Sequence, residues 1–478
     1  MSFPYQSGQG ISSPLVKGGV GDYMRLNLDK INKIYLSGIG GIGLSALAYY
    51  FLNLKKQVIG SDLSESEVTR RLLAQGIDIY FKQKATNITS DIDLFIYSSA
   101  LPSDHPELSK AKEMNIPTLT YFEFLGFLSK KYRTVAVAGT NGKTTTTAML
   151  GLALEKAGLD PTVIVGSLVP EWGSNFRFGQ SDILVVEACE WQAHMLEIKP
   201  QIIILSNVAE DHLDYYKDLA DIKKHFQKFV GKLPADGLFI KNFDDANSGA
   251  IKFSGATLTF GKDAKADYHF SDLKINTGEQ KFSVYKNKEL FSEIDLSIPG
   301  EYNIYNSLAA IVAADYLGAN KHQLWNALHE FKGPWRRFEK VGTVKTNIVI
   351  SDYAHHPDSI QGLLRAAKDF YPDKKLIAIF QPHHHNRTQT LLEDFAKSFY
   401  LADQVIISEI YQVSGRENKK HEAITSQDLL GRMNHNKKYY AADFKEIKNI
   451  LKKINPTSSV LLFIGAGDID NLAREMIK

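Results

Sequence analysis

Residues 134–147 read TVAVAGTNGKTTTT: a short β-branched strand pattern, a turn with two glycines, and the start of a helix pattern. Phosphate binding needs this order, because glycines let backbone N–H groups turn onto phosphate oxygens and a helix N-terminus adds its positive dipole end. Lys143 is expected to reach the β- and γ-phosphates of ATP, and Thr144 or Thr145 to offer a hydroxyl to Mg²⁺. The predicted ATP-binding loop consists of Gly139, Thr140, Asn141, Gly142, Lys143, Thr144 and Thr145.

The spacing of this loop departs from the general P-loop pattern, in which four residues separate the first glycine from the second. Here that first position is Val137, and Gly139 lies only three residues before Gly142. The short loop argues against the common GTPase and transport-ATPase classes. The plainer alternative is a chance Gly-Lys-Thr in a strand-to-helix turn, which the strand and helix patterns on either side argue against.

Two further stretches repeat the order of strand, turn and helix, at 33–43 and at 347–370. Short apolar, β-branched runs elsewhere suit parallel strands buried on both faces, and strands that alternate with helices predict an α/β fold. We expect three domains after a flexible tail at 1–30: Rossmann-like at 31–130, P-loop ATPase-type at 131–334 and Rossmann-like at 335–478. Alternation of apolar and polar residues at 257–298 predicts an antiparallel insertion in the middle domain.

The composition is that of a soluble globular protein, with 44% hydrophobic and 23% charged residues in 478. A net charge of +2 lies far from the basic excess of a dedicated nucleic-acid binder. Cys189 is the lone cysteine, so no internal disulfide is possible, and with no His or Lys beside it we interpret it as structural. No apolar run is long enough to insert into a membrane, and residues 1–21 lack a secretory signal, so a cytoplasmic location is expected. Met24 is an alternative start to Met1.

Carboxylates follow the strand pattern at 183–187, in VVEACE at 185–190, and a second strand pattern leads to SNVAEDHLD at 206–214. The carboxyl ends of parallel strands are where α/β proteins bind ligands, and Mg²⁺ prefers oxygen ligands beside phosphate oxygens. Glu187 is therefore a candidate metal ligand together with Thr144. His212 is a candidate ligand for a second metal. The common alternative for each is a solvated loop residue.

The segment GEYNIYNSLAA at 300–310 begins another helix pattern. Asn303 and Asn306 lie three residues apart, on one helical face, where they could hydrogen-bond an adenine edge or a ribose. Asn303 could instead be only a helix cap, a position that asparagine favours.

The phosphate loop, the acidic residues after it and the Asn-x-x-x-Asp-His segment follow one another in an order that resembles the Mur ligase family. These are the cell-wall amino-acid ligases, whose loop reads Gly-Thr-x-Gly-Lys-Thr-Thr. The resemblance covers nearly the whole chain from about residue 33 and favours nucleotide contact by Asn303 and Asn306. This sequence departs from the relatives' Glu-Ala-Asp-Glu-Ser-Asp, because Cys189 replaces the first Asp and Trp191 the Ser. A carbamylated lysine, found in sister ligases for later amino acids, has no convincing counterpart here.

The turn GIGGIG at 38–43 is weak evidence alone and most often means NAD or FAD. With GSD at 60–62 and YSSA at 97–100 it resembles the family's UDP-sugar domain. The resemblance implies UDP-sugar contacts at Gly38, Gly40, Gly41, Gly43, Asp62, Ser98 and Ser99. TYFE at 120–123 lacks the Arg that relatives carry there.

Three segments resemble the family's last domain and the hinge before it. In GPWRRFE at 333–339, Arg336 and Arg337 are expected to reach the γ-phosphate, with solvated arginines as the alternative. In DYAHHP at 352–357, the resemblance implies nucleotide contact by Asp352 and substrate contact by His355. FQPHHHNRT at 380–388 resembles a Phe-Gln-Pro-His-Arg-x-x-Arg-Thr segment, which implies that His383 and Arg387 bind the amino acid, although His384 stands where relatives carry Arg. Three consecutive histidines also invite a metal interpretation, which we weight less, because neighbours on a strand point different ways.

Within the family the chain most resembles members that ligate L-alanine to UDP-N-acetylmuramate through an acyl phosphate, in peptidoglycan precursor synthesis. The resemblance implies ATP and two Mg²⁺ as cofactors, and the two substrates as the partners. Lys143, Glu187, His212 and Arg337 are the implied catalytic residues. We expect neither nucleic acid nor membrane as a partner, and the sequence leaves the oligomeric state open.

Other functions stay open at this point. The nearest is a recycling ligase that adds a preformed tripeptide to the same sugar nucleotide. A folate-type polyglutamate ligase would lack the first domain. A P-loop ATPase without ligase activity would have no use for two further nucleotide-type domains. An NAD-binding regulator would use the first glycine-rich turn, with Asp62 on the ribose.

Overall fold

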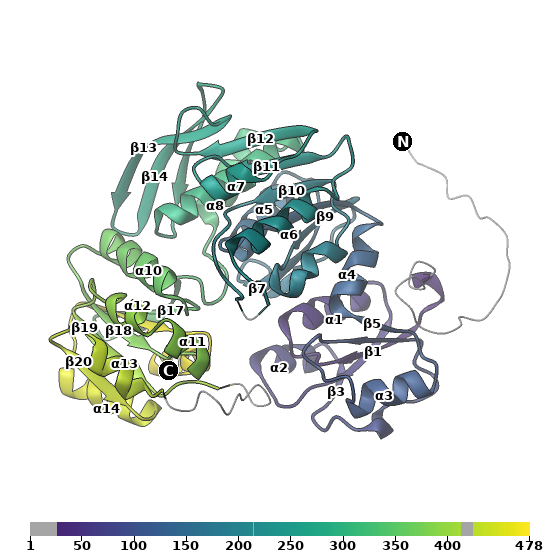
Figure 1. Ribbon diagram of the computed structural model, residues 1–478, viewed down its shortest axis with the longest axis horizontal. Coiled ribbons are helices and arrows are strands. Elements are labelled where there is room, and N and C mark those ends of the chain that lie inside the picture. Colours follow the sequence, from purple (N-terminus) through teal and green to yellow (C-terminus); the bar gives the residue numbers. More distant parts are fainter. Residues whose placement is uncertain (1–25, 214, 413–423) are drawn as a thin grey trace. The chain divides into compact units, whose positions relative to one another are not determined.

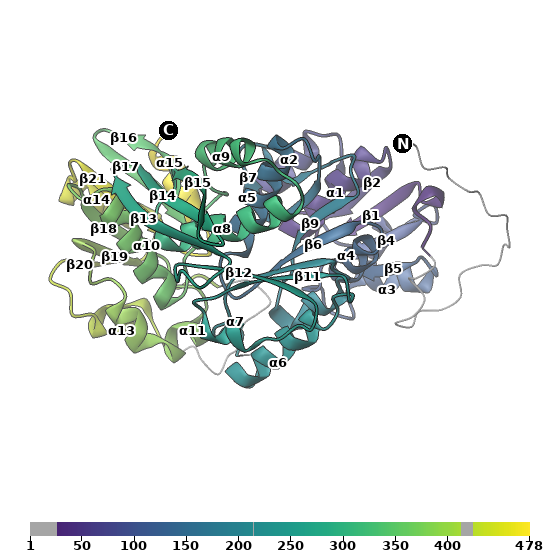
Figure 2. The same ribbon diagram turned by 90° about the horizontal axis from the view of Figure 1, so that it is seen from above.

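The computed structural model describes residues 26–213, 215–412 and 424–478. Residues 1–25 of the predicted tail, Met24 among them, therefore lie outside the described residues. Within the last part of that tail, Leu28–Lys30 form a short 3-10 turn (η2), and Leu28 is buried. The chain forms two compact units, which divide between Lys131 and Tyr132. Figure 1 and Figure 2 show their helices and strands coloured along the sequence.

The first unit is built on a five-stranded parallel sheet with the order β3-β2-β1-β4-β5. The strands are β1 (Lys33–Ser37), β2 (Gln57–Ser61), β3 (Asp78–Tyr80), β4 (Leu94–Tyr97) and β5 (Thr118–Thr120). The helices are α1 (Ile42–Asn53), α2 (Glu67–Leu73), α3 (Pro106–Glu113) and α4 (Tyr121–Ser129), with the turn η3 (Ala85–Asn87). The strand order reverses between β1 and β4, so the glycine-rich turn after β1 lies at the switch point, where such sheets bind ligands.

The second unit begins with a ten-stranded sheet, order β15-β14-β13-β12-β11-β10-β6-β9-β7-β8. Its mainly parallel part contains β6 (Arg133–Ala138), β7 (Thr162–Val169), β8 (Ser174–Arg177), β9 (Ile183–Glu187), β10 (Ile202–Leu205) and β11 (Leu238–Asn242). The helices are α5 (Lys143–Lys156), η4 (Trp191–Glu197), α6 (Leu219–Val230), α7 (Ala246–Ala250), α8 (Glu301–Tyr316) and α9 (Lys321–Glu330). Helices α5, α8 and α9 share one apolar core with the sheet, and α5 and α8 lie side by side in Figure 1.

The predicted antiparallel insertion is partly wrong. β12 (Ala256–Gly261) pairs parallel with β11, and the start of β13 (Tyr268–Asn276) pairs parallel with β12. Only β13, β14 (Glu279–Lys286) and β15 (Glu289–Leu296) pair antiparallel. The ribbon thus continues the central sheet and is no separate insertion.

The remainder of the second unit holds a six-stranded sheet with the order β16-β17-β21-β18-β19-β20. The strands are β16 (Glu339–Val344), β17 (Asn347–Asp352), β18 (Lys375–Phe380), β19 (Gln404–Ser408), β20 (Lys438–Ala441) and β21 (Ser459–Ile464). The helices are α10 (Pro357–Phe370), α11 (His385–Thr390), α12 (Leu392–Lys397), α13 (Ser426–Arg432), α14 (Phe444–Ile454) and α15 (Ile469–Met476). Alternate residues of β18 and β21 enter two separate cores, so the sheet is buried on both faces.

The α/β class predicted from the sequence is confirmed by these three sheets. Among the helices of the described ranges, none is long and apolar enough to cross a membrane.

Candidate active site

The loop between β6 and α5 has a backbone that only glycine fits. Gly142 is the N-cap of α5 at φ 87°, and Gly139 has φ 133°. A Cβ atom would collide with Asn306 Oδ1 at the first position and with Ser206 Oγ at the second. The loop is therefore a glycine cradle at a helix N-terminus, which fits phosphate oxygens.

The segment that follows β10 holds this loop through hydrogen bonds. Asn207 Oδ1 accepts from the amide of Asn141 at 2.9 Å, and Asn207 Nδ2 donates to the carbonyl of Asn141 at 3.0 Å. Ser206 Oγ donates to the same carbonyl at 2.6 Å. The Thr140 hydroxyl and Ala209 exchange two further bonds, of 2.9 and 3.2 Å. The loop conformation is therefore fixed largely by a second segment.

Lys143, the first residue of α5, lies folded against its own loop. Its Nζ donates to the carbonyl oxygens of Gly139 and Thr140, at 2.6 and 3.0 Å, and lies 2.8 Å from Glu190 Oε2. Burial disfavours its charged form, but the Glu190 carboxylate outweighs burial and holds the pKa of Lys143 above its ordinary value. Lys143 is thus a charged cation held at the place where phosphates would enter.

Glu187, at the end of β9, contacts the loop through Thr144. Thr144 Oγ1 donates to Glu187 Oε2 at 3.0 Å, and the amide of Gly166 donates to Glu187 Oε1. Burial raises the pKa of the Glu187 carboxyl above its ordinary value, against the Gly166 amide and the Lys143 charge. The structure thus brings together two of the three predicted metal ligands.

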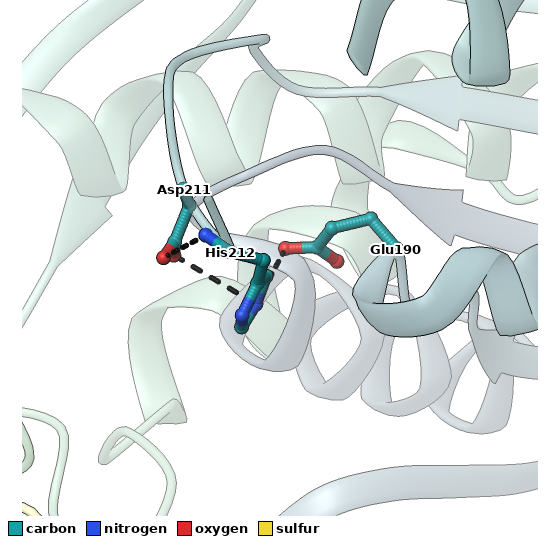
Figure 3. Close-up of side chains that lie close together, drawn as sticks. All are labelled: Glu190, Asp211 and His212. Atoms are coloured by element: carbon teal, nitrogen blue, oxygen red, sulfur yellow. Dashed lines mark hydrogen bonds and ion pairs between the residues drawn. The ribbon is translucent and has the colours of Figure 1, made fainter. Parts of the chain in front are cut away.

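The third predicted ligand, His212, lies in a different cluster, with Glu190 and Asp211 (Figure 3). Its Nε2 is 3.8 Å from Glu190 Oε1 and 3.8 Å from Asp211 Oδ2. Within the described part of the chain this is the one group of three such side chains close enough to share an ion, with ligand atoms within 4.8 Å of one another. Burial works against ionisation of Asp211, yet His212 and Arg387 hold its pKa below the ordinary value. The donor set fits a hard divalent cation with remaining positions for phosphate oxygens.

Asn303 and Asn306 are buried in α8, 4% and 5% exposed. Asn306 Nδ2 donates to Asn303 Oδ1 at 3.0 Å, and Asn303 Nδ2 donates to the carbonyl of Pro299 at 2.7 Å. The alternative that Asn303 is only a helix cap is wrong, because Gly300 is the N-cap. Both asparagines line the cavity described below.

The two predicted arginines after the hinge contact the same tyrosine ring but differ in whether they line the cavity. The guanidinium groups of Arg336 and Arg337 each lie 5.0 Å from the ring of Tyr353. Arg336 donates to the carbonyl of Gly465, whereas Arg337 lines the cavity. Asp352 is held by the amides of Phe338 and Ala354, at 2.6 and 2.7 Å. Burial raises the pKa of Asp352, and the charge of Arg337 opposes this rise.

His355, His383 and Arg387 all line the same cavity. Burial, with the charges of Arg387 and Arg337, lowers the pKa of His355 to about 4. Burial, with His384 and His355 beside it, lowers the pKa of His383 to about 3. Both imidazoles are thus neutral at physiological pH.

The rings of His383 and His384 contact each other, with 4.0 Å between centroids, but among the described residues the histidines at 383–385 form no group of three ligands close enough to share an ion. The ring of His383 stacks on Tyr411 with 5.7 Å between centroids. His385 Nδ1 is 2.8 Å from the carbonyl oxygen of Ile424. The backbone between them turns at His384, with φ 66°.

A cavity of about 1620 Å³ joins these groups at the carboxyl ends of both sheets of the second unit. Of the predicted site residues, the cavity is lined by Thr140, Asn141, Gly142, Lys143, Thr144, Thr145, His212, Asn303, Asn306, Arg337, Asp352, His355, His383 and Arg387. Gly139, Glu187 and Arg336 are described residues that do not line it. Glu190 and Asp211 do line it, and the sequence-based ligand set did not include them.

The glycine-rich turn of the first unit is hydrogen-bonded to Asp62. The amide of Gly40 donates to Asp62 Oδ2 at 2.8 Å, and that of Leu63 to Asp62 Oδ1 at 2.7 Å. Gly38, at φ 86°, packs against Ser98, whose Cβ would lie 3.1 Å from an added Cβ. Asp62 therefore shapes the turn, while Ser98 joins the turn after β1 to the turn after β4.

Three family models match the chain in order. They are Mur ligase family, catalytic domain, over residues 33–133, Mur ligase middle domain, over 137–314, and Mur ligase, glutamate ligase domain, over 336–467. Together they reach from the first strand to the turn after β21.

Curated relatives match over nearly their full length. A UDP-N-acetylmuramate–L-alanine ligase of Caldanaerobacter subterraneus subsp. tengcongensis is 39% identical, covering 95% of this chain and 99% of the relative. A protein of the same name from Alkaliphilus metalliredigens is 40% identical, covering 94% and 98%.

Solved structures agree. A UDP-N-acetylmuramate–alanine ligase from Thermotoga maritima is 31% identical, with a TM-score of 0.80 over 93% of this chain and 98% of that one. A murein peptide ligase from Psychrobacter arcticus reaches a TM-score of 0.70 over 93% and 98%, and at 22% identity this likeness shows the fold alone. The phosphate loop, the three family models and the near full-length identity lead to one conclusion: the chain belongs to the Mur ligase family.

Proposed function

We propose that this chain ligates L-alanine to UDP-N-acetylmuramate through an acyl phosphate, with ATP cleaved to ADP and phosphate. The observation that carries the proposal is near full-length identity, 39–40%, to ligases of that name. The cavity of the second unit supports it, because the phosphate loop and the residues proposed to bind the amino acid line the same space.

In this proposal Gly142 and Lys143 receive the phosphates of ATP, and Asn303 and Asn306, which line the same cavity, hydrogen-bond the purine or ribose. Lys143 already carries its charge there, since Glu190 keeps it protonated. Arg337, which lines the same cavity, adds a second cation. Positive groups placed before the reaction stabilise the charge that develops in phosphoryl transfer.

Two Mg²⁺ ions are part of the proposal. Thr144 and Glu187 would hold one, and His212, with Glu190 or Asp211, the other. When bound, Mg²⁺ neutralises the phosphate oxygens that a carboxylate must approach.

At the acceptor end, the lactyl carboxylate attacks the γ-phosphoryl group and ADP leaves, which gives the acyl phosphate. The amine of L-alanine then attacks the acyl carbon, loses a proton and expels phosphate. In this proposal Arg387, which lines the cavity, binds the L-alanine carboxylate as a bidentate pair. His355 and His383 are neutral there, so they offer hydrogen bonds without adding charge. The sugar nucleotide is held by the glycine-rich turn of the first unit.

Phosphate release from the purified protein, with ATP, Mg²⁺ and UDP-N-acetylmuramate, tests the proposal. The arms are L-alanine, the tripeptide L-alanyl-γ-D-glutamyl-diaminopimelate, and no acceptor. Release that requires L-alanine is expected. Release that requires the tripeptide would instead assign a recycling ligase, and release equal in all arms would assign an ATPase without ligation.

A further inference from the structure

Tyr216 is a buried aromatic residue, 2% exposed, that stands four positions after His212. Its hydroxyl donates to the backbone carbonyl of Glu190, 26 residues earlier in the chain. The ring packs edge-on against His225, with 5.1 Å between centroids. Burial raises the pKa of the Tyr216 phenol above its ordinary value, so the hydroxyl stays a donor at working pH.

Glu190 connects the phosphate loop to the second loop. Its carboxylate lies 2.8 Å from Lys143 Nζ through Oε2 and 3.8 Å from His212 Nε2 through Oε1. The side chain is buried, so both contacts depend on where its backbone stands. Besides Tyr216, the carbonyl of Glu190 accepts the amide of Ala193 at 2.8 Å.

Tyr216 holds both halves of the cluster through different atoms. Its hydroxyl fixes the Glu190 carbonyl, and its amide donates to the carbonyl of His212 at 3.0 Å. Tyr216 therefore links the Glu190 backbone to the His212 backbone, and the amide of Tyr215 also donates to the His212 carbonyl, at 2.9 Å.

The backbone at this place is strained. Gln192 and Ala193, just after Glu190, have φ of 49° and 57°, and His212 has φ of 53°. Non-glycine residues keep such angles only where surrounding contacts over-determine them, and these conformations cluster at functional sites. The Tyr216 hydroxyl is one of the contacts that hold the strained segment in place.

We propose that Tyr216 is a positioning residue that sets the geometry in which Glu190 and His212 meet a nucleotide-bound divalent cation. The proposal rests on the proposed function for the identity of the nucleotide and the metal. It assigns Tyr216 no contact with substrate.

Tyr216→Phe removes the hydroxyl and keeps the ring, and Tyr215→Phe, on the half-exposed neighbour (46% exposed), is the matched control. Calorimetry measures ADP affinity for each protein in EDTA and over a Mn²⁺ series, with Mn²⁺ as the probe for Mg²⁺. The gain in ADP affinity that Mn²⁺ brings should fall about tenfold in Tyr216→Phe, the cost of one lost hydrogen bond to a buried group. It should stay within about twofold in Tyr215→Phe.

Equal Mn²⁺-coupled affinity in wild type and Tyr216→Phe would overturn the proposal, even if the thermal midpoint dropped, since the role would then be structural. A Tyr216→Phe protein that failed to fold would also overturn it, because the hydroxyl would then serve the fold. Steady-state kinetics adds a second readout: kcat should fall while KM for the sugar nucleotide is unchanged. ADP and Mn²⁺ binding needs neither sugar nucleotide nor L-alanine, so failure of the ligase assignment would appear separately, as absent phosphate release in the wild type.

Discussion

At the scale of single residues, Lys143 supplies the positive charge of the phosphate loop. Its ammonium is partly buried, charged and paired with Glu190, so replacement by alanine removes the cation and leaves the buried Glu190 carboxylate without that ion pair. We expect Lys143→Ala to lower kcat about 100- to 1000-fold, as loss of a group that stabilises transition-state charge does. Coupled phosphate release measures this, with Lys156→Ala at the exposed end of the same helix as the control. Turnover within tenfold of wild type would contradict the role, and affinity for UDP-N-acetylmuramate should be unaffected.

His383 makes a second prediction, about stability and pH. Its folded pKa is about 3, below the ordinary value of 6.5, because burial disfavours the charged ring. The unfolded chain therefore binds more protons between these values, and stability present above pH 6.5 is lost as pH falls through the window. When the pH falls from 7.5 to 4.5, both proteins should lose stability, but the loss in free energy of unfolding should be about 1–2 kcal/mol smaller in His383→Gln than in wild type. One pKa unit is worth about 1.4 kcal/mol, and the partial exposure of the ring weakens the effect.

Urea unfolding at the two pH values measures that difference. The exposed His322→Gln serves as the control and should follow wild type. An equal loss in wild type and His383→Gln would show that His383 does not take part in the acid sensitivity.

Single residues also show where sequence reasoning stops. Lys143 and Thr144 could be predicted because the loop is a local motif whose order follows from phosphate chemistry. Glu190 and Asp211 were within reach, since each stands within three residues of a predicted ligand. The contact that groups Glu190 with His212, however, joins two loops that are distant in the sequence, and local patterns do not report it. Tyr216 carries no local signal, because its partner lies 26 residues away.

At the scale of elements, hydrogen bonds from the segment after β10 hold the backbone of the phosphate loop in its conformation. Asn207 makes two hydrogen bonds to the backbone of Asn141. We expect Asn207→Ala to raise KM for ATP about tenfold, because each lost bond loosens a loop that must be fixed before ATP arrives. KM for the sugar nucleotide should stay within about twofold. The control is Asn276→Ala, at the exposed hairpin end of β13, and an unchanged KM for ATP in Asn207→Ala would refute the bracing role.

The sheets show what periodicity can and cannot predict. Buried apolar runs predicted the parallel strands because both faces of those strands are covered, as the two cores around β18 and β21 show. Alternation at 257–298 indicated half-exposed strands, and β13 to β15 are such strands. The parallel pairing of β12 with β11 was missed, because alternation reports which face is buried and not the direction of the neighbouring strand.

At the scale of the whole molecule, each compact unit carries its own glycine turn at the start of a helix, after β1 in one and after β6 in the other. We expect the two turns to bind different substrates, the sugar nucleotide and ATP, so that damage to one leaves binding at the other. Gly40 offers the test, because an added Cβ would lie 2.8 Å from both Asp62 Oδ2 and Thr69 Cγ2.

Gly40→Val should therefore weaken UDP binding at least about tenfold, since the turn must open to admit the side chain. Its affinity for ADP with Mg²⁺ should stay within about twofold of wild type, while phosphate release in the complete assay falls. Gly431→Val, on an open surface of the second unit, is the control and should alter neither affinity. Calorimetry with each nucleotide alone separates the two sites. A parallel loss of UDP and ADP affinity in Gly40→Val would contradict independent sites, and unchanged UDP affinity would remove the first unit from sugar-nucleotide binding.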